Sequence, residues 1–103
     1  MLKFILISQL IILPIFRPVH VSKINGKLKG IVLMAGSNKP IKDVYLYIIK
    51  GEEEATTNSR GEFEITTWQK APFFLTVKHA QFKDAVIKIK SLEERVTVFL
   101  QPK

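Results

Sequence analysis

From Lys27 onward, apolar and polar residues alternate with a period of two in short segments, separated by turn-forming residues about every ten positions. No segment has helical spacing over any length. This alternation is typical of half-buried antiparallel strands. The positions expected to face the interior are Leu28, Gly30, Val32 and Met34; Val44, Leu46 and Ile48; Phe63 and Ile65; Phe73, Leu75, Val77 and His79; Ala85, Ile87 and Ile89; and Val96, Val98 and Leu100.

About seven short strands follow from this pattern. Parallel sheets need crossover helices, and the pattern contains none. We therefore predict an all-β fold, a small antiparallel two-layer β-sandwich of the transthyretin-like or Ig-like kind. A small β-barrel is the alternative.

The segment Thr57–Phe63 has the residue types of a tight turn between strands. Asn58 can open a type I turn by bonding its side chain to the backbone two residues on, and Gly61 accepts the positive φ that follows. Phe63 then returns the chain to the core. We expect this turn to be a hairpin tip between the third and fourth strands.

The first 22 residues differ from the rest. Met1–Lys3 is a short positive start, Phe4–Phe16 is an apolar run, and Arg17-Pro18 ends it. The run is shorter than the about 20 residues that cross a bilayer, so residues 1–22 are predicted to be a signal peptide, cut after Ser22, or an uncleaved anchor. A buried N-terminal strand or helix is the alternative. The protein is thus expected to be exported, to the periplasm, cell surface or outer membrane.

The chain has no cysteine, which excludes disulfides, thiol nucleophiles and thiol-linked lipid anchors. Its formal charge is +7, but the lysines are scattered, as is typical of solubilising residues. Nucleic acid is not an expected partner, because a basic strip needs interleaved aromatic side chains for stacking. The strip that the outward registers predict contains Lys78, Lys83, Lys88 and Lys90, and Phe74 is the only nearby aromatic residue on an outward register.

Several segments together resemble the carboxypeptidase regulatory-like domains. These domains are transthyretin-like (prealbumin-like) β-sandwich modules, also found at the N-terminus of exported and outer-membrane transport proteins of Bacteroidetes-type bacteria. The matching segments are Gly30-Ile31-Val32, Lys39-Pro40-Ile41, Val44-Tyr45-Leu46, Thr57–Phe63, Leu75-Thr76-Val77 and Val98–Pro102. The resemblance covers residues 27–103 and implies an accessory module separate from the zinc-bearing peptidase domain.

No catalytic, cofactor or metal site is expected. A zinc hydrolase needs three convergent ligands and a general base, and His79 is the only histidine after the signal segment. We expect His79 to be a packed or hydrogen-bonded histidine at the edge of the core. Glu52-Glu53-Glu54 is expected to be a solvated loop, because consecutive carboxylates point in alternating directions.

Apolar residues also occupy several outward positions: Ile31, Leu33, Tyr45, Tyr47, Ile49 and Phe99. If their strands adjoin, they form an apolar patch that could bind a protein partner or envelope component, with Tyr45, Tyr47 and Phe99 as candidate contacts. Carbohydrate binding is the alternative function, with Trp68 and Phe73 as further stacking candidates. Strand twist, or retained N-terminal residues covering the patch, would explain the same residues without a partner.

Overall fold

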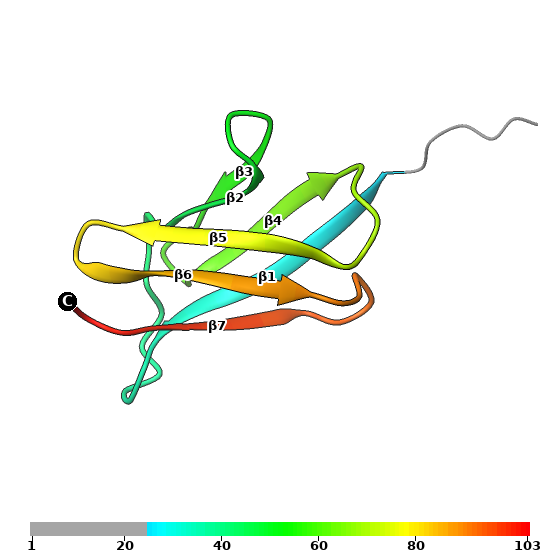
Figure 1. Cartoon of the computed structure of the whole chain (residues 1–103). Helices are drawn as coiled ribbons and strands as arrows, with labels where there is room; N and C mark the ends of the chain where they lie inside the picture. Colours follow the sequence, from blue (N-terminus) through cyan, green and yellow to red (C-terminus); the bar gives the residue numbers. More distant parts are fainter. Residues whose placement is uncertain (1–24) are drawn as a thin grey trace, which may run out of the picture.

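The computed structural model describes residues 25–103, which form seven strands and no helix (Figure 1). The strands are β1 (Gly26–Met34), β2 (Tyr45–Ile49), β3 (Glu53–Thr56), β4 (Glu62–Thr67), β5 (Phe73–His79), β6 (Phe82–Ile89) and β7 (Val96–Leu100). The predicted signal segment, residues 1–22, lies outside the described residues. Within residues 25–103 there is no helix with the length and hydropathy needed to span a membrane.

The strands form two sheets that enclose one core. The three-stranded sheet has the order β4-β1-β7 and the four-stranded sheet the order β3-β2-β5-β6. Buried side chains come from both sheets. Because the chain folds into two separate layers with their apolar faces together, the predicted β-sandwich is confirmed.

One strand pair departs from the antiparallel pattern. β1 and β7 are parallel, with Val32 beside Val98 and Leu33 beside Phe99, whereas the other four strand pairs among residues 25–103 are antiparallel. A parallel pair normally needs a crossover connection. Here the paired strands are the first and last of the domain, so the remaining strands serve as that connection and no helix is required.

The alternating pattern predicts most of the core, although Ile41 and Phe82 are buried outside the expected positions. Leu28, Val32, Leu46, Leu75 and Val98 are at most 1% exposed. The other buried apolar residues are Ile41, Val44, Phe63, Ile65, Phe73, Val77, Phe82, Ile89 and Leu100. Burial alternates most regularly along β1, β4, β5 and β7.

The turn at Asn58 was expected to be a hairpin tip, and this expectation is wrong. β3 and β4 belong to different sheets, so the turn carries the chain across the sandwich. Buried Thr57 fixes the start of the crossing: its hydroxyl donates to the Ile41 carbonyl at 2.7 Å and accepts from the Val44 N–H at 2.9 Å. At the far end the Val32 N–H donates to the Gly61 carbonyl at 2.8 Å, which ties the turn to β1.

Glu53 closes the nearby edge of the sandwich. Its carboxylate accepts from the Thr67 hydroxyl at 2.6 Å and from the Trp68 N–H at 3.1 Å, and the residue is only 7% exposed. The solvated loop expected at Glu52–Glu54 is therefore wrong, because Glu53 begins β3 with its side chain turned toward β4 and the residues that follow it. At the opposite edge the Lys83 N–H donates to the Gln101 carbonyl at 2.8 Å, which joins the start of β6 to the chain after β7.

Candidate functional site

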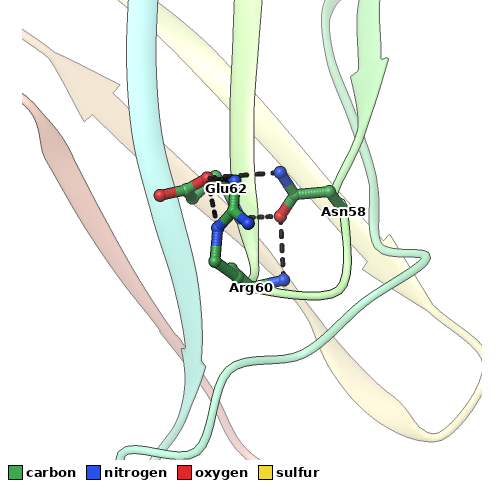
Figure 2. Close-up of polar contacts among 3 residues, drawn as sticks. All are labelled: Asn58, Arg60 and Glu62. Atoms are coloured by element: carbon green, nitrogen blue, oxygen red, sulfur yellow. Dashed lines mark hydrogen bonds and ion pairs between the residues drawn. The ribbon is translucent and has the colours of Figure 1, made fainter.

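The turn between β3 and β4 is held together by a network of polar contacts centred on Asn58 (Figure 2). The side-chain oxygen of Asn58 accepts from the Arg60 N–H at 2.9 Å and from the Glu62 N–H at 3.0 Å. Gly61 has a φ of 75° and donates its N–H to the Asn58 carbonyl at 2.9 Å. The predicted roles of Asn58 and Gly61 are confirmed.

Glu62 ends this network at the surface. Its Oε1 accepts from the Asn58 side-chain amide at 3.2 Å and from Arg60 Nε at 3.2 Å. These contacts, first the Asn58 amide and then the Arg60 guanidinium, hold the pKa of the Glu62 carboxyl below its ordinary value. An Oε1 that already has two donors in its own turn is poorly placed to act as a base or ligand.

We expect the Asn58→Ala variant to raise the pKa of Glu62 toward that of a free glutamate, as measured by NMR titration of the side-chain carboxyl. In the parent, a lowered native pKa means that the contribution of Glu62 to stability is present above the unfolded-state value. This stabilising contribution is lost as the pH falls from about 4, the ordinary pKa of a glutamate in the unfolded chain, through the lower pKa of Glu62 in the folded protein. Ser59→Ala, at a turn residue that does not contact Glu62, is the control. An Asn58→Ala titration curve superimposable on the parent's would contradict this assignment.

A surface depression beside the turn is lined by side chains of both charges. Lys29 and Arg95 contribute positive charge, and Glu62 and Glu64 contribute negative charge. Opposite charges in equal number give no preference for an anion or a cation.

Tyr45 and Tyr47 lie on the outer face of the four-stranded sheet. They flank buried Leu46 on β2, and their ring centroids are 5.5 Å apart. The Tyr45 hydroxyl donates to the Glu54 carboxylate, and this hydrogen bond raises the pKa of the Tyr45 phenol. The Gly51 N–H donates to the same carboxylate oxygen at 3.1 Å. The Tyr45 ring is therefore held in place by the hairpin between β2 and β3.

The same outer face carries further exposed apolar side chains that the sequence could not assign to it. Phe74 on β5 is 58% exposed and Val86 on β6 is 64% exposed. Thr76 pairs with Tyr47 on one side and with Val86 on the other, so these side chains form a row across β2, β5 and β6. Phe74 lies two residues before Thr76 on the same face. We call Tyr45, Tyr47, Phe74 and Val86 the outer aromatic face.

Phe99 does not belong to this surface. It is 52% exposed beside Leu33, on the three-stranded sheet. Because the two sheets meet through their inner faces, Phe99 and the tyrosines point out of opposite sides of the sandwich. The expected single patch of Tyr45, Tyr47 and Phe99 is therefore wrong: β1 and β7 adjoin each other, but β2 lies in the other sheet.

The two additional candidates for glycan binding, Trp68 and Phe73, differ in exposure. Trp68, which follows β4, is 48% exposed. Phe73 is only 8% exposed and lies in the core, since it occupies an inward register of β5. Trp68 and Phe73 therefore do not form a stacking platform together. Of the neighbouring residues Phe73 and Phe74, only Phe74 exposes its ring.

His79 lies at the edge of the core, as expected. Its ring meets Phe82 edge to face with centroids 5.2 Å apart, and its Nδ1 accepts from the Gln81 N–H at 3.1 Å. These contacts stabilise the hairpin between β5 and β6. In residues 25–103, no three histidine, aspartate or glutamate side chains come together in a way that could hold a metal ion.

Comparison with known families agrees with the fold. A family model described as CarboxypepD_reg-like domain matches residues 28–103. The chain therefore belongs to the carboxypeptidase regulatory-like domain family, and the resemblance inferred from the sequence is confirmed. The comparison with curated proteins gave no significant match.

Proposed function

We propose that this protein is a non-catalytic accessory module that binds a protein partner, or another component of the cell envelope, through the outer aromatic face. Its membership in a regulatory-like β-sandwich family supports an accessory role. The charged start and apolar run of residues 1–22 support export to the periplasm, the cell surface or the outer membrane.

The observation that carries this proposal is the Tyr45–Tyr47 pair, with ring centroids 5.5 Å apart, on the same face as strongly exposed Phe74. Tyrosine offers a rigid apolar ring and a hydroxyl for hydrogen bonding, so it is enriched among the residues that dominate protein interfaces. The hydrogen bond to Glu54 fixes Tyr45 before binding, which lowers the entropic cost of ordering it.

The opposite face is a weaker candidate. Phe99 is strongly exposed there, but Lys27, paired with Glu64 at 3.2 Å, belongs to the same sheet. Charged residues are depleted at the centres of protein interfaces and aromatic residues are enriched. The outer face of the four-stranded sheet also carries charged side chains, Lys78 and Lys88. It is favoured because it carries three aromatic rings, Tyr45, Tyr47 and Phe74, whereas the opposite face has only Phe99 among the described residues.

Replacing Tyr47 with serine is expected to weaken partner binding about 30-fold, because a central tyrosine contributes about 2 kcal/mol when truncated. The measurement is titration of the partner, isolated by crosslinking in the cell envelope, against the full chain. Phe99→Ser is the matched control, since it removes an exposed ring from the other sheet. Equal affinity of Tyr47→Ser and the parent would refute the assignment of this face.

Carbohydrate binding remains the second candidate because Trp68 is 48% exposed and exposed aromatic rings can stack on sugars. Titration of soluble glycans against the parent, Tyr45→Ala and Trp68→Ala separates the two functions. Glycan binding that either substitution abolishes favours the carbohydrate function. If the parent binds none of the glycans and Tyr47→Ser loses its protein partner, the protein-binding function is favoured.

A further inference from the structure

β6 forms an open edge of the four-stranded sheet and is the longest edge strand in the described chain, with eight residues. The chain after β7 covers only its beginning, where the Lys83 N–H donates to the Gln101 carbonyl. Further along, Val86 is 64% exposed at the middle of the strand. An open edge of this length presents unpaired backbone groups that can accept another strand.

The direction of these backbone groups follows from the hydrogen bonds across the sheet. The Thr57 N–H donates to the Val44 carbonyl at 3.0 Å, so the peptide groups of Val44 point toward the β3 side. Peptide groups alternate sides along a strand, so those of Tyr45 and Tyr47 point toward β5. Their partners there are Lys78 and Thr76.

The same alternation continues to the edge. On β5 the peptide groups of Leu75 and Val77 point toward β6, where they meet Ile87 and Ala85. The peptide groups of Val86 and Lys88 therefore point out of the sheet at the open edge. The pairing of β5 with β6 is irregular between Ala85 and Phe82, so this alternation does not extend to Asp84. The side chains of Val86 and Lys88 lie on the outer face. The carboxylate of Asp84 reaches the same face, since it contacts Lys78 at 3.5 Å, and Lys78 is paired with Tyr45.

This edge is complementary to itself. Asp84 and Lys88 each lie two residues from Val86, on opposite sides of it. When two copies of β6 run antiparallel with Val86 opposite Val86, Asp84 of each copy faces Lys88 of the other. The half-buried residues Ala85 and Ile87 also face each other, which would cover apolar surface at the edge of the core. Each of these matches follows from a single register.

We propose that two copies of this chain associate through β6, antiparallel and centred on Val86, so that their four-stranded sheets become one continuous sheet. Opposite charges directly across a strand pair stabilise it, and like charges destabilise it. A register centred on Lys88 would place two lysines opposite each other, which disfavours it. Within one copy Asp84 also contacts Lys78 at 3.5 Å, but both side chains are about half exposed and Asp84 can accept from a second lysine.

The natural chain has no cysteine, so a single introduced cysteine reports the pairing directly. In the proposed register the two residue-86 Cα atoms lie about 5.5 Å apart, within the range of a disulfide. Mild oxidation of full-length Val86→Cys is expected to give a covalent dimer on a non-reducing gel. Thr66→Cys, an exposed position on edge strand β4, is the control and is expected to stay mostly monomeric. A dimer yield for Val86→Cys no higher than for Thr66→Cys would overturn the proposal.

The charge pairs provide an independent test in full-length chains purified in mild non-ionic detergent. Lys88→Glu and Asp84→Lys, each alone, are expected to weaken self-association about tenfold or more, because like charges then face each other twice. Mixed together, the two variants place opposite charges at both positions and are expected to recover association as a heterodimer. Lys50→Glu, an equal charge change at the turn after β2, is the control.

Every variant keeps residues 1–24, so differences between them report on β6. Failure of the mixed variants to associate would contradict the register. The charge variants change none of the four residues of the outer aromatic face, so the outcome of the charge test is distinguishable from a failure of the proposed partner surface.

Discussion

Phe63→Ala is expected to lower the free energy of unfolding by about 3 to 5 kcal/mol, because it removes a large ring from a small core without disulfides. Phe63 is 6% exposed. Its ring lies against Gly30 on β1: a Cβ built on Gly30 would be 2.7 Å from the Cζ atom of Phe63. Alanine would leave this space empty. Urea denaturation of both proteins measures the change.

Phe74→Ala is the matched control, because it makes the same change at a ring that is 58% exposed. We expect it to cost less than about 1 kcal/mol. Nearly equal effects of the two substitutions would contradict the inward register of β4 and the outward position of Phe74.

Gly61→Ala is expected to cost about 2 to 4 kcal/mol, because two effects combine at this turn. Its φ of 75° disfavours any residue with a Cβ, at about 1 kcal/mol. In addition, a Cβ there would lie 2.6 Å from the Val32 carbonyl oxygen, a backbone atom that cannot rotate away. Overpacking of this kind costs about 1 to 3 kcal/mol.

Gly51→Ala separates the two effects. Gly51 has a similar φ of 82°, but a Cβ there would meet nothing within 4 Å. Its substitution should cost only the conformational term of about 1 kcal/mol, measured by the same denaturation experiment. A Gly61→Ala protein no less stable than Gly51→Ala would show that the contact between the turn and β1 is not tight.

The strand registers could be predicted because alternation is a local property: the face of a side chain depends on its place in its own strand. The roles of Asn58 and Gly61 could also be predicted, since a turn within a few residues fixes its own chemistry. Burial of Phe73 follows from the register too, and that register argued against Phe73 as a stacking residue.

Strand order could not be predicted, because it depends on contacts between segments far apart in the sequence. Leu33 and Phe99 are neighbours across a parallel pair, whereas the tyrosines of β2 lie on the other sheet. The Asn58 turn looks like a hairpin in sequence, but Thr57 and Gly61 join it to Ile41, Val44 and Val32, which lie outside the turn. The outer aromatic face could not be predicted either, because it depends on the pairing of β5 with β2 and β6.

The central claim is that the outer face of the four-stranded sheet is the partner-binding surface. Its most direct test places a photoreactive phenylalanine derivative at Tyr47 or at Phe99 in the full chain and irradiates intact cells. We predict a covalent adduct with one defined envelope partner from position 47, lost when Tyr45 is also replaced by alanine, and none from position 99. An adduct from position 99 with none from position 47 would contradict the claim.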